Sequence, residues 1–217
     1  MVLLSTAYFP NIEYFSQIIS NRQIFIEQHE NFIKQTYRNR TIILAANGPV
    51  PLIIPVAKGR GLKVKIKDLK ISYDEDWQRN HWRTIFSAYG SSPFFEFYAD
   101  DFEPFFRKKY RFLLDLNTDI LNLLTELLEI EPEIKQTEGF EQIPEGCLNL
   151  RESFIPGQKE PAGEGNFTYI KYTQVFSDKL GFVPNLSILD ILFNAGPETY
   201  SLIEDGLREP NSKDSGN

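Results

Sequence analysis

The segment 185–196 has the clearest pattern of apolar and polar positions in the chain. At helical spacing, aliphatic residues and Phe193 cover most of the circumference, and only Ser187, Asp190 and Asn194 form a narrow polar strip. This pattern is typical of a buried helix. A carboxylate on such a helix needs partners, because burying an unpaired charge is costly. Ser187 and Asp190 also have the spacing of a capping box, so the strip is either a structural cap or the wall of a polar site.

Periodicity predicts the other elements as well. Two apolar runs around the turn signal Asn47-Gly48 indicate a hairpin at residues 37–56, and the prolines in its second half predict an edge strand or an interrupted one. The polar segment 131–167 has no apolar period and predicts a long loop, while the tail 210–217 is polar enough to be disordered. Helices are predicted at 11–19, 74–89 and 117–129, with Asn117 as the N-cap of the last, and strands at 2–8, 22–28, 63–67 and 169–176.

The order of these elements predicts the fold class. The strands come as one hairpin and isolated pieces, and not as repeated strand–helix–strand units. We therefore expect an α+β fold, in which one domain over residues 1–209 has a mixed or largely antiparallel sheet packed by several helices. A chain of 217 residues with 41% hydrophobic content is long enough to bury such a core.

Composition excludes several classes of function. A net charge of −7 argues against general nucleic-acid affinity, because binding to phosphate backbones needs a basic surface. No run approaches the roughly 20 apolar residues of a membrane span, and the N-terminus lacks the pattern of a signal peptide. The single cysteine, Cys147, excludes an internal disulfide framework. We therefore expect a cytoplasmic protein with no membrane span and no nucleic-acid partner.

Two segments carry candidate acid–base groups. His81 lies on the apolar face of the helix predicted at 74–89, where it is either a core histidine with one hydrogen bond or a general base whose pKa is tuned by burial. Glu27 and His29 share one face of a predicted strand and form either a surface pair or an acid–base dyad. HExxH and CxxC motifs are absent from the sequence, so we expect neither a metal site nor a cofactor.

Cationic residues near the hairpin are candidates for binding anions. Arg38-Asn39-Arg40 precedes the first apolar run. A guanidinium can bind a carboxylate or a phosphate bidentately, although the same string could equally anchor the fold. The alternating segment 63–67 presents lysines on one face, which is either a solvated strand face or a phosphate contact.

Several separated strings resemble the WbqC-like protein family in their order and spacing, over nearly the whole chain. They are Tyr8-Phe9-Pro10, Tyr37-Arg38-Asn39-Arg40, Ile54-Pro55-Val56, a middle block with Trp77, His81 and Tyr89 before Ser92-Pro93-Phe94-Phe95, and Asn185-Leu186-Ser187-Ile188-Leu189-Asp190 with Leu192-Phe193-Asn194-Ala195-Gly196. Many members begin with a His-Gln-Pro string, whereas this chain has Leu4-Ser5-Thr6. The family occurs in bacterial surface-polysaccharide gene clusters and has been suggested to contain aminoacyl (glycyl) transferases acting on sugars.

The resemblance implies a cytoplasmic transferase that moves an aminoacyl or other acyl group, from an acyl donor or an acidic carrier protein, onto an amino sugar or a nucleotide sugar. In this hypothesis His81 accepts a proton from the sugar nucleophile, and Asp190 with Asn194 orients the base or the sugar hydroxyls. The alternative is a non-catalytic ligand-binding or assembly protein that uses the aromatic residues between positions 94 and 106 for a partner. The predicted ligand-binding residues are Tyr8, Glu27, Lys34, Asn39, Arg40, Tyr89 and Asn194.

Overall fold

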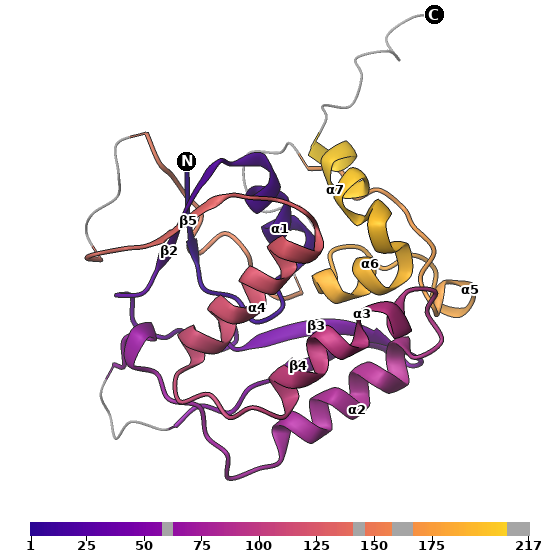
Figure 1. Cartoon of the computed structure of the whole chain (residues 1–217), viewed down its shortest axis with the longest axis horizontal. Coiled ribbons are helices and arrows are strands. Elements are labelled where there is room, and N and C mark those ends of the chain that lie inside the picture. Colours follow the sequence, from indigo (N-terminus) through magenta and orange to yellow (C-terminus); the bar gives the residue numbers. More distant parts are fainter. Residues whose placement is uncertain (58–62, 141–145, 158–166, 208–217) are drawn as a thin grey trace, which may run out of the picture.

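The computed structural model of the protein describes residues 1–57, 63–140, 146–157 and 167–207 (Figure 1). The predicted tail 210–217 and parts of the predicted loop 131–167 lie outside these ranges. The larger of two sheets has four parallel strands in the order β5-β2-β1-β6. These strands are β1 (Val2–Ser5), β2 (Gln23–Glu27), β5 (Glu133–Gln136) and β6 (Leu148–Asn149).

The parallel sheet corrects the expectation of a mixed or largely antiparallel one, while the combination of helices and sheets confirms an α+β fold at the coarse level. Helix α1 (Ile12–Ser20) joins β1 to β2, and such a crossover places the two strands side by side and parallel. Val2, Leu3 and Leu4 of β1 have no exposed surface, as is typical of parallel strands covered on both faces. The segment 131–167 is not only a loop, because it supplies β5 and β6 to this sheet.

The predicted hairpin is confirmed as β3 (Arg40–Ala45) and β4 (Gly48–Ile53). Within the described residues β4 pairs only with β3. Pro49 and Pro51 therefore lie in an edge strand, where a missing backbone N–H leaves no neighbouring strand unpaired.

The predicted helices are confirmed with shifted ends. α2 (Trp77–Tyr89) begins later than predicted, and α4 (Leu113–Leu127) begins earlier. Asn117 is therefore not the N-cap of α4; it lies inside the helix and is 2% exposed. The remaining helices are α3 (Phe95–Phe102), α5 (Ser177–Leu180), α6 (Ile188–Ala195) and α7 (Thr199–Leu207), with the 3-10 turns η1 (Ile66–Asp68), η2 (Glu103–Phe106) and η3 (Gly196–Glu198).

The strand predicted at 63–67 is wrong. Lys65 makes one isolated bridge to Asn31, and the chain then enters the turn η1. Of these residues only Ile66 is buried, so a tight turn that inserts one side chain into the core replaces the alternating strand.

The strand predicted at 169–176 is also wrong, because these residues join no ladder in the structure. The side chains of Tyr172 and Gln174 instead donate hydrogen bonds to Asp190 at 2.7 and 2.9 Å. Side-chain contacts with the buried helix α6 therefore hold this segment.

One hydrophobic cluster runs through the described residues from Val2 to Ile203. Most aromatic residues between positions 94 and 106 belong to it, whereas Phe97 is 73% exposed. The aromatic segment considered above as a docking surface is thus mainly core. Figure 1 shows the β3–β4 hairpin across the middle of the molecule, with α2 and α3 on one side and the parallel sheet on the other.

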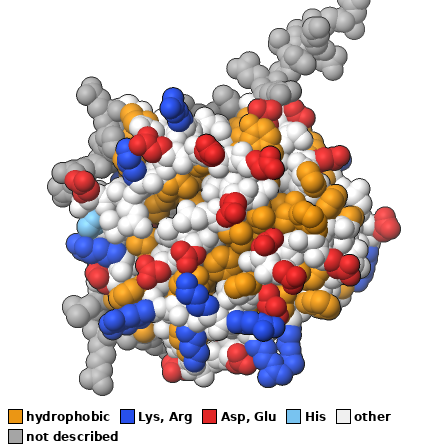
Figure 2. Space-filling model, in the orientation of Figure 1, with side chains coloured by type: hydrophobic (Ala, Val, Ile, Leu, Met, Phe, Trp, Pro, Cys, Tyr) orange, Lys and Arg blue, Asp and Glu red, His pale blue; other side chains and the backbone are white. Residues whose placement is uncertain are grey.

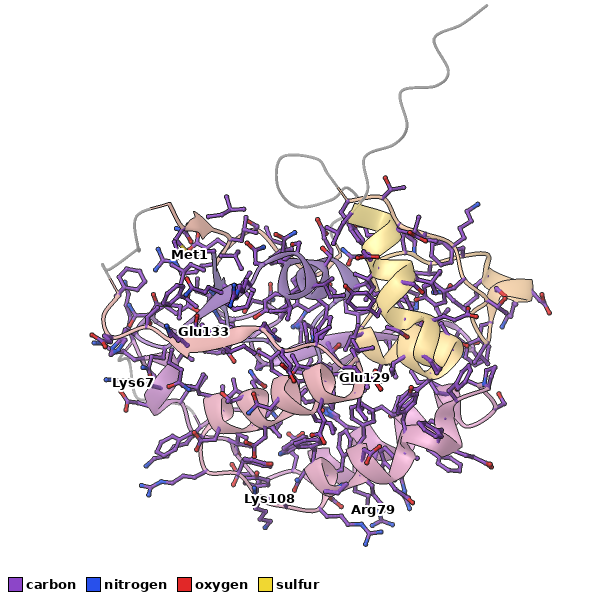
Figure 3. The ribbon with its side chains drawn as sticks, turned by 45° about the horizontal axis from the view of Figure 1, so that its top comes forward. Met1, Lys67, Arg79, Lys108, Glu129 and Glu133 are labelled. Carbon is purple, nitrogen blue, oxygen red and sulfur yellow. The ribbon has the colours of Figure 1, made fainter. Side chains whose placement is uncertain are left out.

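Charge is unevenly distributed over the face shown in Figure 2. Lys and Arg side chains are most numerous along its lower edge, with a few at the upper left, while Asp and Glu side chains are spread over the whole face. Arg79 and Lys108 on this lower side point away from the body of the protein in Figure 3. Among the described residues, no helix combines the length and the apolar character that crossing a membrane requires.

Candidate functional site

The carboxyl ends of the four parallel strands meet at one edge of the larger sheet. β1 lies inside the sheet, with β2 and β5 on one side and β6 on the other. In open parallel sheets, ligands bind in the crevice outside the carboxyl ends of the strands. The residues that follow these strands are therefore the first candidates for a ligand site.

Four charged side chains form a cluster at this edge, which we call the edge cluster: Glu27, Glu30, Arg38 and Arg151. Arg38 donates to both carboxylate oxygens of Glu30 at 2.7 Å, and Arg151 donates to Glu27 at 2.9 Å. Arg38 also donates to the backbone carbonyl of Arg151 at 3.2 Å, which links the two pairs. Glu27, Glu30 and Arg38 are buried. Because burying ions is costly, such a cluster marks a position with a specific structural or functional role.

Glu27, a predicted ligand-binding residue, is enclosed in this cluster. Its Oε1 accepts hydrogen bonds from the backbone N–H of His29 at 2.7 Å and from the Thr137 hydroxyl at 2.9 Å. The His29 ring lies elsewhere, with Nε2 3.1 Å from the Thr137 carbonyl oxygen. The carboxylate of Glu27 thus has its hydrogen-bond partners inside the protein. His29 contacts this carboxylate through its backbone N–H and not through its ring.

A cavity of about 580 Å³, which we call the edge cavity, lies beside the cluster. Glu30 and Arg151 form part of its wall, and burial raises the pKa of Glu30 against the opposing effect of Arg38. A carboxyl group with a raised pKa in a cavity wall is a candidate for proton transfer. The other lining residues are Asn31, Phe32, Ile33, Lys63, Phe140, Asn149, Glu152 and Ser153.

A second cavity, of about 340 Å³, has three predicted ligand-binding residues in its wall: Lys34, Asn39 and Arg40. We call it the hairpin cavity. The Arg40 Nε atom is buried and has no hydrogen-bond partner in the described part of the chain. The Asn39 amide donates to the Ile54 carbonyl at 2.8 Å, so Asn39 also anchors the end of the hairpin. Phe32 lines both cavities, which are therefore neighbours.

His81 and Tyr8 lie together in the core. His81 Nδ1 is 3.0 Å from the Tyr8 hydroxyl oxygen, and the Trp77 ring meets the His81 ring edge-on with a centroid distance of 5.1 Å. Burial lowers the pKa of His81 to about 4, against the opposing effect of a hydrogen bond with the Ile53 backbone. The imidazole is therefore neutral at pH 7. It is not part of the wall of the edge cavity or of the hairpin cavity.

The buried His81 should make the protein less stable in mild acid. The pKa of His81 is about 4 in the folded protein, against 6.5 as its ordinary value. Between these two values the unfolded chain binds more protons, so the free energy of unfolding falls as the pH falls. The full effect is about 3 kcal/mol below the folded pKa. Urea unfolding from neutral pH toward pH 5 should show a steeper decline for the wild type than for His81→Gln, and equal declines would contradict the lowered pKa.

Asp190 lies on α6 with both carboxylate oxygens occupied. Tyr89 donates to one oxygen at 2.9 Å, and Tyr172 and Gln174 donate to the other. The Asn194 amide donates to the backbone carbonyl of Asp190 at 2.7 Å. Burial raises the pKa of Asp190, and these three side-chain hydrogen bonds oppose the rise. Asp190 thus ties α2, α6 and the segment before α5 together, away from the edge cavity and the hairpin cavity, whose walls do not include it.

The chain is thus an α+β protein with a short parallel sheet, and an ionic cluster lies at the carboxyl ends of the strands of this sheet. Residues 6–151, which contain the whole edge cluster, match the sequence model of the WbqC-like protein family, and the chain belongs to this family. It is 26% identical over 223 residues to "Uncharacterized protein Rv1507c" of Mycobacterium tuberculosis (strain ATCC 25618 / H37Rv), a similarity that covers 91% of this chain and 94% of that protein. No solved structure matches the chain.

Sequence reasoning missed Glu30 and Arg151. Glu30 follows a predicted strand, so its position after a carboxyl end was an available signal, but Arg151 lies in a segment without periodicity and gave none. Leu4-Ser5-Thr6, where many family members have His-Gln-Pro, lies at the carboxyl end of β1. The departure from the family pattern therefore falls at the same edge as the candidate site.

Proposed function

We propose that this protein is a cytoplasmic transferase of bacterial surface-polysaccharide synthesis, which moves an aminoacyl or other acyl group onto the amino group of a nucleotide sugar. The observation that carries the proposal is the adjacency of two cavities around Phe32. The charged residues described in the wall of the hairpin cavity are all cationic, whereas the wall of the edge cavity has both carboxyl groups and cationic groups. The resemblance to the family supports the biological setting.

The hairpin cavity suits the diphosphate of such a ligand. Lys34 and Arg40 supply positive charge, and none of the described lining residues is acidic. The Arg40 guanidinium, whose Nε has no hydrogen-bond partner in the described part of the chain, offers donors to phosphate oxygens. Hydrogen bonds between a guanidinium and a phosphate are charge-assisted and often bidentate, so this side chain would contribute strongly to affinity.

The edge cavity suits the sugar. Asn31, Asn149 and Ser153 offer uncharged donors and acceptors for sugar hydroxyls, and Phe32 and Phe140 offer apolar surfaces for the C–H face of a ring. Pockets for small molecules commonly combine a mainly apolar wall with a few polar groups that fix orientation. The sugar would thus lie against the edge cluster, and the phosphates would lie beyond Phe32.

Glu30 is the group proposed to accept the proton. The sugar amine nitrogen attacks the carbonyl carbon of an activated acyl donor, an ester or a thioester. A C–N bond forms, the bond from the carbonyl carbon to the donor oxygen or sulfur breaks with its electron pair leaving on that atom, and the amine proton passes to the Glu30 carboxylate. Burial raises the pKa of Glu30, which makes its carboxylate a stronger base for this transfer.

Replacing Arg40 with Met should weaken the binding of a nucleoside diphosphate sugar by about 10–100-fold, because the charge-assisted hydrogen bonds to phosphate are lost. Isothermal titration with UDP-N-acetylglucosamine and dTDP-glucose measures the change. Arg79→Met is the matched control, since it removes the same charge from a side chain that is 62% exposed and points into solvent (Figure 3).

Two outcomes would reject the phosphate role: no binding of either probe to the wild type, or equal affinities for the Arg40→Met and Arg79→Met variants. Transfer is measured separately, as a gain in mass of an amino-sugar nucleotide when an aminoacyl thioester is supplied. Binding without any gain in mass would favour the non-catalytic ligand-binding alternative.

A further inference from the structure

A third cavity, of about 380 Å³, lies between α4 and the parallel sheet, and we call it the α4 cavity. Ile26 and Gln136 in its wall are register partners on one face of the sheet. Glu27 follows Ile26 and points to the opposite face, because successive side chains of a strand alternate. The α4 cavity and the edge cluster are therefore on opposite faces of the same edge. The lining residues are Thr6, Ala7, Pro10, Tyr14, Ile26, Asn117, Thr118, Leu121, Asn122, Ile134 and Gln136.

Asn117 in this wall has an acceptor with no partner. Its amide nitrogen donates to the Thr6 hydroxyl at 3.1 Å and to the Arg38 carbonyl at 2.9 Å, which uses both N–H groups. The carbonyl of Arg38 can only accept, so the orientation of the amide is fixed. Asn117 Oδ1 is left buried with no hydrogen-bond partner in the described part of the chain, although the residue is only 2% exposed. An unpaired buried acceptor costs about 1–3 kcal/mol, which a ligand donor would recover.

Thr6 supplies the complementary group. Its hydroxyl oxygen accepts from Asn117, and its own O–H remains to donate. Asn117 and Thr6, both residues of the wall, thus bring an unpaired acceptor and an available donor close together. A ligand hydroxyl satisfies such a pair by donating to one and accepting from the other. The exposed Asn122 and Gln136 add further amides at the mouth.

The rest of the wall limits the ligand class. None of its described residues is charged, so a phosphate, a carboxylate or a zwitterionic amino acid would be desolvated without an ionic partner. Ile26, Leu121 and Ile134 add apolar surface. The volume lies near the lower end of the roughly 300–1,000 Å³ typical of ligand sites. A small neutral molecule with several hydroxyl groups and an apolar C–H face satisfies all three conditions.

We propose that the α4 cavity is a second ligand site, which binds a neutral monosaccharide through Asn117 and Thr6. This site does not depend on the nucleotide-sugar site, because it lies on the other face of the sheet and contains no cationic side chain among its described residues. A protein with both sites could hold two sugar units at one edge of the sheet.

The test uses the full chain with glucose, galactose and N-acetylglucosamine as probes, measured by saturation-transfer NMR and titration. We expect at least one probe to bind the wild type, and Asn122→Trp to weaken it at least tenfold, because an indole placed at this exposed helix position fills the mouth of the cavity. Glu126→Trp, at an exposed position one turn further along α4 and outside the wall, should bind like the wild type. Thr6→Val should weaken binding by about tenfold through loss of one hydrogen bond.

Absence of binding for all three sugars, or equal binding to the Asn122→Trp and Glu126→Trp variants, would overturn the proposal. Phe140→Ala distinguishes the two sites, since Phe140 lies in the wall of the edge cavity and not in the wall of the α4 cavity, so this variant should leave monosaccharide binding unchanged. Loss of monosaccharide binding in Phe140→Ala would place the sugar in the edge cavity and would likewise overturn a separate site. Circular dichroism of each variant verifies that it is folded.

Discussion

The Arg38→Met variant should unfold with a free energy about 3–5 kcal/mol below that of the wild type, because removing one partner leaves the other buried as an uncompensated charge. Glu30 is 5% exposed, and both of its carboxylate oxygens accept hydrogen bonds from Arg38 at 2.7 Å. The guanidinium also supports the carbonyl of Arg151. Urea unfolding followed by fluorescence measures the loss.

Arg107→Met is the matched control for this change. Arg107 donates to Glu103 at 2.6 Å, but its side chain is 74% exposed, so its loss should cost less than about 1 kcal/mol. The pH dependence adds a second readout. Arg38 lowers the pKa of Glu30, so in the Arg38→Met variant the carboxyl group stays protonated to higher pH. A protonated carboxyl group carries no unpaired charge, so the stability that the variant loses relative to the wild type should become smaller in mild acid. If both arginine variants lost the same stability, or if the loss in Arg38→Met did not change with pH, the buried Arg38–Glu30 pair would not be the cause of the loss.

The apolar and polar pattern predicted those elements that form from residues close together in the sequence. The hairpin follows from Asn47-Gly48 between two apolar runs, and the helix at 185–196 from an almost continuous apolar circumference. β5 and β6 could not be found this way, since β6 has two residues and β5 has one partly buried side chain, Ile134. These strands exist because they pair with β2 and β1, and pairing across such distances in sequence has no local signal.

The candidate site shows the same division. Lys34, Asn39 and Arg40 are close in sequence, and the structure does bring them to one cavity. The edge cluster joins Arg151 to Glu27 across the sheet, and only the parallel register that places β6 beside β1 makes that contact possible. Single candidate residues can thus be recognised in the sequence by their chemical type. Which of them lie together depends on how the strands pair in the folded protein.

Replacing Asp190 with Ala should lower the free energy of unfolding by about 3–5 kcal/mol, because it removes the shared acceptor of three donors and leaves them buried. Tyr89 and Gln174 are less than 2% exposed, so water cannot easily replace the carboxylate. Tyr172→Phe removes only one of the three hydrogen bonds and should cost about 1–2 kcal/mol. Thermal and urea unfolding of both variants measure this order of effects.

Asp178→Ala is the control for the removal of a negative charge, since Asp178 is exposed on the short helix α5, and it should change stability by less than about 0.5 kcal/mol. The pair of variants also separates the two roles considered for Asp190. A structural tie predicts a large loss of stability in Asp190→Ala, with ligand binding retained below the transition. A catalytic role predicts the reverse, a protein as stable as Asp178→Ala that binds its ligand and no longer turns it over.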